Sequence, residues 1–319
     1  MRAARLLPVS LAALILAGCA PTGSDAVAID PTVDALGQAL ATYPDVPVEA
    51  DLAYGTVDGV PLLLDACLPP DRDADAAPVP GVVVIHGGSW REGRKDSVGW
   101  RSVCQWLADS GYPAFSVDYR LAPDDPFPAA FEDVQAAVAW VRAESARFGV
   151  DPARVGVFGG SAGGNLAALL GTWGTGDLTE GARVAAVVDL SGPIDLTGAD
   201  LTDDFAPLQL EYLGCADFAD CPAAVAASPG SYVDADDPPF FVAHSTTEKI
   251  PLAQSDRFVE ALRGAGVDVE YLVADGTLHS IALLDDDLKA RILAFYARTL
   301  GPGEPDRPAV AEGDPRALG

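Results

Sequence analysis

Residues 155–172 read VGVFGGSAGGNLAALLGT, a β-branched stretch, then a serine among small residues, then a leucine- and alanine-rich stretch. The first six residues predict a short buried strand and the last eleven predict a helix. Gly159, Ser161 and Gly163 fit the pattern G-x-S-x-G, in which a sharp strand-to-helix turn exposes the serine oxygen. The neighbours must be small because larger side chains at the flanking positions would collide across the turn.

The same alternation of strands and helices continues on both sides of this turn. The stretch 81–86 is a continuous apolar run, typical of a strand that is buried on both faces. The stretch 127–149 predicts the clearest helix, because its apolar residues recur at spacings of three and four. Further strands are expected at 112–120, 182–192, 238–244 and 267–275, and further helices at 102–111, 251–266 and 285–300. This order predicts an α/β fold with a mostly parallel sheet and helices on both faces.

The composition narrows the classes of partner. The chain has 319 residues, of which 47 are acidic and 20 are basic, so its formal net charge is −27. A phosphate backbone or an anionic membrane surface would be repelled by this charge, which argues against nucleic acid as a partner. The other interpretation is that the acidity only keeps the surface soluble.

The N-terminal residues predict a targeting segment. Arg2 and Arg5 form a basic start, and the apolar run 6–17 is too short for an ordinary membrane span. The run ends in Leu-Ala-Gly before Cys19, which resembles a bacterial lipobox. Residues 1–18 are therefore expected to be a signal peptide, and Cys19 the lipidated N-terminus of an exported cell-envelope protein. The alternative is a plain secretory signal that happens to hold a cysteine.

The remaining sequence is divided by composition and cysteine content. Residues 19–49 are expected to be a tether, residues 50–302 the folded domain, and residues 303–319 a disordered Pro/Gly-rich tail.

Disulfides are favoured in an exported chain, because the compartment outside the cytoplasm is oxidising. Six residues separate Cys215 from Cys221, so this pair is the preferred bridge, and Cys67 with Cys104 follows by elimination. The spacing shows no Cys/His cluster that would indicate a metal.

A second glycine-rich motif follows the predicted strand 81–86. It reads HGGSW over residues 86–90, and such a loop can aim backbone N–H groups at the oxyanion of a tetrahedral intermediate. The amides of Gly88, Ser89 and Ala162 are the predicted donors, and His86 is expected to organise the loop. An ordinary tight turn after a strand is the alternative.

Four motifs together carry a family resemblance. HGGSW at 86–90, DYRLAP at 118–123, FPAAFEDVQAAVAWV at 127–141 and GGSAGGNLAA at 159–168 resemble carboxylesterases of the α/β-hydrolase fold, in particular the hormone-sensitive-lipase-like and feruloyl-esterase-like groups. The resemblance spans residues 50–302 and implies ester substrates and a Ser-acid-His triad in that chain order. One departure is that Ser89 replaces the third glycine of the common HGGG loop.

The chain order of this triad places the acid and the general base after the serine. The chain has three histidines, and His279 lies in the loop between the last strand and the last helix, where the fold places its base. In related sequences a motif similar to HGxxD, which ends in the acidic residue, precedes a Val-Pro pair. In this chain Glu248 replaces the aspartate of that motif, and the stretch from it to Pro251 is one residue shorter. Pairing of Glu248 with a neighbouring lysine is the alternative interpretation. Two aspartates, Asp275 and Asp256, are the reserve acids.

These motifs predict a serine carboxylesterase that cleaves small or medium esters through an acyl-enzyme intermediate and needs no cofactor or metal. Trp90 and the aromatic residues of the segment 195–235 are expected to line a substrate pocket, although packing of a loop against the sheet edge is an equal alternative. An arylformamidase or a peptidase would use the same machinery. The non-enzymatic alternative is an inactive hydrolase scaffold that binds a partner at the cell surface. The oligomeric state stays open.

Overall fold

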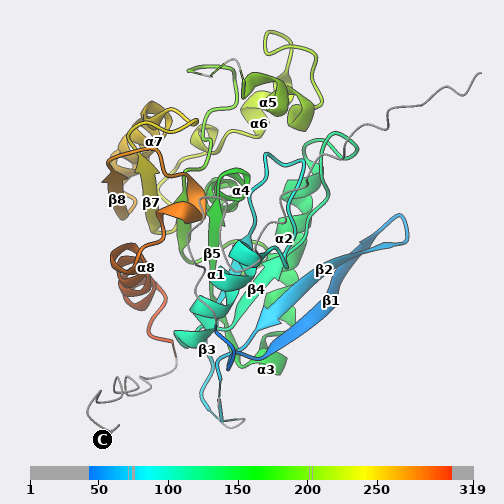
Figure 1. Ribbon diagram of the computed structural model, residues 1–319, viewed down its shortest axis with the longest axis vertical. Coiled ribbons are helices and arrows are strands. Elements are labelled where there is room, and N and C mark those ends of the chain that lie inside the picture. Colours follow the sequence, from blue (N-terminus) through cyan, green and yellow to red (C-terminus); the bar gives the residue numbers. More distant parts are fainter. Residues whose placement is uncertain (1–42, 71, 74–75, 201, 203, 304–319) are drawn as a thin grey trace, which may run out of the picture. The chain divides into compact units, whose positions relative to one another are not determined.

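Eight strands in the described part of the chain form a single mixed sheet (Figure 1). The computed structural model describes residues 43–70, 72–73, 76–200, 202 and 204–303, all of which fall within one of the two units into which the chain divides. The predicted signal peptide, Cys19 and all but the first residue of the predicted tail lie outside the described residues. The strands are β1 (Val48–Val57), β2 (Val60–Cys67), β3 (Val79–Ile85), β4 (Ala114–Val117), β5 (Val150–Gly160), β6 (Val187–Leu190), β7 (Phe240–Ser245) and β8 (Val269–Ala274).

The sheet has the order β1-β2-β4-β3-β5-β6-β7-β8. All neighbouring pairs from β4 to β8 are parallel, whereas β2 is antiparallel to both β1 and β4. The predicted α/β class and the mostly parallel sheet are confirmed. The antiparallel hairpin of β1 and β2 was not predicted. Asp58 and Gly59 form its turn with φ of 50° and 81°, the left-handed conformation that two-residue hairpin turns require.

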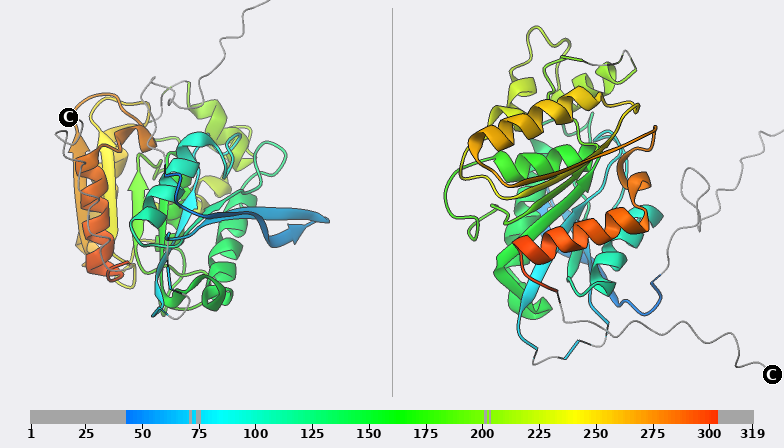
Figure 2. Two further views of the ribbon diagram at one scale, coloured as in Figure 1. Left: turned by 60° about the horizontal axis from the view of Figure 1, so that its bottom comes forward. Right: turned by 90° about the vertical axis from the view of Figure 1, so that its left-hand side faces the viewer.

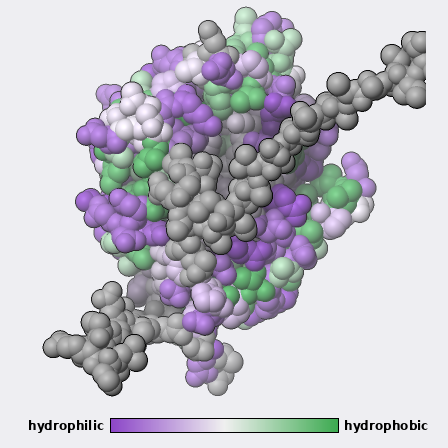
Figure 3. All heavy atoms as spheres, viewed as in Figure 1, coloured by the Kyte–Doolittle hydropathy of each residue, from purple (hydrophilic) through white to green (hydrophobic). Residues whose placement is uncertain are grey.

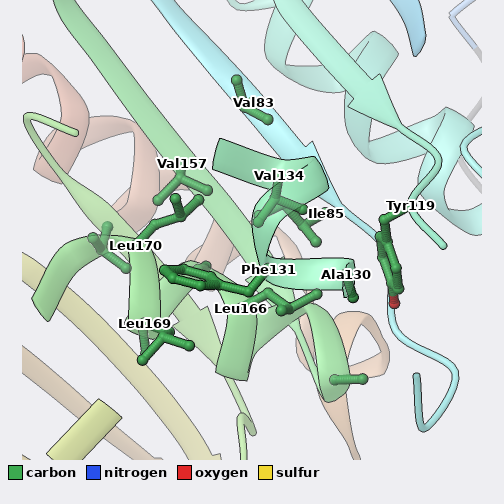
Figure 4. Close-up of a cluster of buried hydrophobic side chains, with 14 of the residues drawn as sticks. Val83, Ile85, Tyr119, Ala130, Phe131, Val134, Val157, Leu166, Leu169 and Leu170 are labelled. Carbon is green, nitrogen blue, oxygen red and sulfur yellow. The ribbon is translucent and has the colours of Figure 1, made fainter. Parts of the chain in front are cut away.

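Helices cover both faces of the sheet, as predicted (Figure 2). The helices are α1 (Val98–Asp109), α2 (Ala129–Ala143), α3 (Ser145–Phe148), α4 (Ala162–Thr172), α5 (Ala206–Leu213), α6 (Pro222–Ala226), α7 (Leu252–Ala265) and α8 (Asp286–Thr299), with 3-10 helices η1 (Pro229–Ser231) and η2 (Ser280–Leu283). One core cluster packs α2, α4 and α7 against the sheet, and a second packs α1 and α8 against the opposite face. Figure 4 shows part of the first cluster, in which leucines of α4 and apolar residues of α2 meet the valines of β3 and β5.

The predicted helix 127–149 is two helices in the structure. The first, α2, ends at Ala143, and the four-residue α3 follows a break at Glu144. Gly149 then takes the left-handed conformation with φ of 64° and ends the helical segment before β5. The apolar spacing of three and four is still correct for α2, because Phe131, Val134 and Val138 all face the first core cluster.

Polar side chains cover much of the surface face shown in Figure 3. This distribution agrees with the large acidic excess of the sequence, since ionised side chains remain in water. Within the described residues, no helix is long and apolar enough to cross a membrane.

Both predicted disulfides are present in the structure. Cys67 at the end of β2 is bonded to Cys104 on α1, and Cys215 is bonded to Cys221 in the loop between α5 and α6. The first bridge therefore ties a helix of one face to the antiparallel part of the sheet, and both of its cysteines are wholly buried. The second closes a short surface loop.

Removal of the first bridge is expected to destabilise the protein more than removal of the second. The loop closed by Cys67 and Cys104 spans 37 residues and that of Cys215 and Cys221 spans six. Because closure entropy grows with loop length, the expected losses are about 4 and about 2 kcal/mol, respectively. Urea unfolding of the two double-alanine variants measures both values. Equal losses would contradict this ranking.

Candidate active site

Ser161 lies at a strained turn between β5 and α4. Its φ is 56° and its ψ is −125°, a conformation that residues with a Cβ rarely adopt. Its backbone N–H donates to the carbonyl of Leu190 on β6 at 2.9 Å, and its own carbonyl accepts from Asn165 N–H at 3.0 Å. These bonds hold the serine at the carboxyl edge of the sheet, which is where the G-x-S-x-G pattern predicts it.

The glycines of this turn are required by close backbone contacts. A Cβ on Gly163 would collide with the carbonyl of Ile85 at the end of β3, and a Cβ on Gly159 would collide with the carbonyl of Gly163. Neither obstacle is the flexible end of a side chain, so neither can move aside cheaply. The small residues therefore serve the turn, as the sequence predicts.

The loop after β3 lies directly against this turn. A Cβ on Gly87 would be 3.0 Å from Ser161 Cβ. Gly88 and Ser89 have φ of 129° and 52°, and no acceptor is found for their amides, or for that of Ala162, in the described part of the chain. Free backbone donors beside a nucleophilic serine are the arrangement that an oxyanion hole needs. The role of these three amides stays a prediction.

His86 holds this loop in place through both its ring and its backbone. Its ring stacks on Tyr119 at 4.2 Å, and its Nδ1–H donates to the carbonyl of Gly87 at 2.8 Å. The Tyr119 hydroxyl donates to the His86 carbonyl at 2.8 Å. Burial lowers the pKa of His86 to about 4, so the ring is neutral at physiological pH. These contacts agree with a structural role.

His279 and Glu248 are brought together at the same edge of the sheet. Glu248 Oε2 contacts His279 Nδ1, and the Glu248 side chain is only 1% exposed. His279 Nε2 is buried and has no hydrogen-bond partner within the described residues. The next residue, Ser280, lies against Gly160, so the loop that carries His279 touches the turn that carries the serine. The three predicted triad residues therefore share one site.

The other candidates for the acid lie elsewhere. Asp256 accepts a hydrogen bond from the Tyr271 hydroxyl at 2.8 Å, and Asp275 is exposed. In the described part of the chain, Glu248 pairs with two histidines and not with Lys249. The geometry thus favours Glu248 over the alternatives that the sequence leaves open.

Hydroxyl groups that the sequence analysis missed fix the loop around His279. Ser245 Oγ at the end of β7 donates to the carbonyl of Leu278, and Ser280 N–H donates to Ser191 Oγ at 3.1 Å. The two serines therefore hold the backbone on either side of His279. No residue-type pattern in the sequence marks them, because they meet this loop only through the order of the strands.

Trp90 is wholly buried in this structure. Its ring stacks on Tyr212 of α5 with centroids 4.2 Å apart and planes 5° apart, and Phe205 lies at 6.2 Å. Arg91 also pairs with Glu211 of α5 at 2.9 Å. These contacts attach α5 to the loop after β3, so Trp90 is a packing residue in this structure. The substrate-binding role of Trp90 stays a prediction.

A buried carboxyl group lies beneath the turn. Asp189 on β6 accepts a hydrogen bond from Gly192 N–H at 2.9 Å through Oδ1, whereas its Oδ2 has no partner within the described residues. Complete burial raises the pKa of Asp189 to about 7, and the charge of Glu248 adds to this shift.

The Asp189→Asn variant is expected to become progressively more stable relative to wild type as pH rises. Between its unfolded pKa near 4 and its folded pKa near 7, Asp189 binds more protons in the folded state, so the free energy of unfolding of the wild type falls as pH increases. Asparagine keeps the acceptor for Gly192 and does not titrate. The difference between the two proteins should grow by up to about 4 kcal/mol across this window. Urea unfolding at pH 5 and pH 8 measures the larger part of this change, about 2 to 3 kcal/mol, and a constant difference would contradict the shift.

Within the described residues, no group of three or more His, Cys, Asp or Glu side chains is arranged to hold a metal ion. The residues brought together at the site offer a serine oxygen, an imidazole, a carboxylate and backbone amides.

Comparison with known proteins identifies the family. The BD-FAE family matches residues 64–262. The chain belongs to this family. It is also 31% identical over 292 residues to the probable carboxylic ester hydrolase LipM of Mycobacterium tuberculosis, covering 85% of this chain and 67% of LipM. The esterase LipQ of the same organism is 32% identical over 244 residues, which cover 73% of this chain and 57% of LipQ.

Solved structures of an esterase resemble the same domain. Esterase 2 of Thermogutta terrifontis with bound propionate has a TM-score of 0.67 and 26% identity, covering 84% of this chain and 98% of that chain. The form phosphonylated by sarin has a TM-score of 0.67 and 25% identity, covering 82% and 98%. The described domain is a carboxylic ester hydrolase of the α/β-hydrolase fold.

Proposed function

We propose that the protein hydrolyses small carboxylic esters by means of a Ser161–His279–Glu248 triad. The observation that carries the proposal is the different surroundings of the two ring nitrogens of His279. Its Nδ1 is occupied by the buried Glu248 carboxylate, while its Nε2 is buried next to the strained serine turn and has no partner among the residues that the structure describes. A general base needs one ring nitrogen held by the acid and the other left for the nucleophile, which supports the proposal.

The reaction follows from these positions. Ser161 Oγ attacks the ester carbonyl carbon while His279 Nε2 takes its proton, and Glu248 stabilises the resulting imidazolium. The amides of Gly88, Ser89 and Ala162 donate to the oxyanion. The intermediate then collapses, and His279 returns the proton to the departing alcohol. Water repeats the sequence on the acyl-enzyme and releases the acid.

The preferred acyl group is proposed to be short. A related esterase has been solved with propionate and with butyrate bound. In this chain the segment between β6 and β7 contributes α5, which is eight residues long, and the five-residue α6. This segment is too short to form the large lid that long triglycerides would favour.

Labelling with a fluorophosphonate probe tests the proposal. The wild-type protein is expected to take up one label and to cleave p-nitrophenyl acetate and butyrate faster than the decanoate. The corresponding anilides distinguish an esterase from an amidase. A folded protein that neither takes up the label nor cleaves an ester would support an inactive scaffold instead.

We further propose that the protein is exported and anchored through lipidated Cys19. The support is the sequence of residues 1–19, with its basic start, apolar run and Leu-Ala-Gly-Cys ending. Expression in a bacterium with radiolabelled palmitate tests this proposal. The label should be incorporated by the wild type and lost in Cys19→Ala, whereas an unlabelled wild-type protein released from the cell would indicate a plain secretory signal.

A further inference from the structure

A third histidine lies in the core directly behind the proposed acid. His244 is the fifth residue of β7 and is wholly buried. Both of its ring nitrogens have partners. Its Nε2 is 2.8 Å from the carbonyl of Ile250, and its Nδ1 is 2.9 Å from the hydroxyl of Ser255 on α7.

These two partners fix the tautomer of His244. A carbonyl oxygen accepts hydrogen bonds but does not donate them, so Nε2 carries the proton. Nδ1 is then the acceptor and receives the Ser255 hydroxyl proton. The ring thus presents an N–H to the carbonyl of Ile250 in the loop between β7 and α7.

The same nitrogen also lies close to the carboxylate of Glu248. His244 Nε2 is 3.2 Å from Glu248 Oε1, an oxygen that also accepts from Ser245 N–H at 3.5 Å, while Glu248 Oε2 contacts His279. Each oxygen of the acid therefore faces a different histidine. Asp189 of β6 is the other acidic group whose charge interacts with Glu248. Among these groups, His244 lies against the Glu248 oxygen that His279 does not contact.

We propose that His244 is a positioning residue that extends the triad by orienting Glu248 toward His279. A glutamate has one more rotatable bond than an aspartate, and the loop that carries it is one residue shorter than the HGxxD-like text predicts. A second contact on the carboxylate compensates for this freedom, because it leaves one rotamer that satisfies both oxygens. This inference rests on the proposed triad.

A double-mutant cycle separates positioning from simple packing. His244→Phe keeps the ring volume but removes the donor, and it is expected to lower kcat about 10-fold or more with KM changed less than about 2-fold. The acidic limb of the kcat/KM profile should move to lower pH, because the His279 imidazolium loses part of its stabilisation. In a Glu248→Gln background the same substitution should change kcat less than about 2-fold. Equal losses in both backgrounds, with an unmoved limb, would overturn the proposal.

Conservative variants provide the control for folding. Gln at position 244 can place an N–H where Nε2 lies, whereas Asn is too short to reach Glu248, so His244→Gln should retain at least about 10-fold more activity than His244→Asn. Equal activity of the two would also reject the role. Val141→Ala on α2 lies in the first core cluster, away from these loops, and should lower Tm without moving the pH profile.

A measurement on the resting protein distinguishes failure of this inference from failure of the esterase. Proton NMR of 15N-histidine-labelled protein detects the Nδ1–H of His279, which should shift strongly upfield in Glu248→Gln and partly upfield in His244→Phe. If this response occurs in a protein that cleaves no ester, the proposed function fails and the positioning role stands. If the resonance does not respond to His244→Phe, the positioning role is wrong whatever the activity.

Discussion

Replacement of Ser161 by alanine is expected to lower ester turnover by at least about 10⁴-fold and to abolish fluorophosphonate labelling. The hydroxyl is the only nucleophile that the turn presents beside the free amides, and alanine removes it without adding volume. Ser161 is 6% exposed, and its backbone bonds to Leu190 and Asn165 do not involve the hydroxyl, so the fold should be retained. Residual turnover should come from the oxyanion amides and from substrate binding alone.

The matched control is Ser231→Ala, which removes an exposed hydroxyl in η1. It should label and turn over substrate as the wild type does. Thermal unfolding of both variants checks that they are folded. If Ser161→Ala retained labelling, the nucleophile would lie at another residue and the assignment of the turn would be wrong.

The parts of the fold that were predicted from sequence are those fixed by local chemistry. The strand β3 (Val79–Ile85), expected at 81–86, is buried along its whole length because its residues are apolar on both faces. The turn at Ser161 could be predicted from the sequence because it requires glycine at Gly159 and Gly163. A Cβ at either position would clash with backbone atoms. Both features depend on a few neighbouring residues, so a single sequence is enough to detect them.

The parts that were missed depend on contacts between distant segments. The break at Glu144 divides a stretch whose apolar spacing alone indicates one helix. The burial of Trp90 depends on α5, a helix that was not predicted and that lies more than a hundred residues later in the chain. The Asp58-Gly59 pair is a sequence signal for a two-residue hairpin turn, although the hairpin was not predicted. The contacts of His244, the last residue of the predicted strand 238–244, could not be predicted because the fold brings its partners together.

The second large loss of activity is expected on replacement of Glu248, and this loss tests the assignment of Glu248 as the triad acid. Glu248→Gln is expected to lower kcat by about 10³- to 10⁴-fold, because a neutral amide cannot stabilise the His279 imidazolium and, if it donates to Nδ1, selects the wrong tautomer. Fluorophosphonate labelling should become slow but not disappear, since Ser161 remains. Initial rates with p-nitrophenyl butyrate, corrected for the labelled fraction, measure the effect.

Glu248→Asp distinguishes the position of the carboxylate from its charge. Because each oxygen of Glu248 contacts a different histidine, shortening the side chain by one methylene is expected to break one of the two contacts and to lower kcat about 10- to 100-fold. The exposed Lys249 is the residue that would pair with Glu248 in the alternative interpretation. Its replacement, Lys249→Ala, should leave kcat unchanged. If Lys249→Ala lowered kcat as much as Glu248→Gln, the charge pair would matter rather than the triad. An Asp variant as active as wild type would show that the loop closes over the shorter acid, and the contact with His244 would then be dispensable.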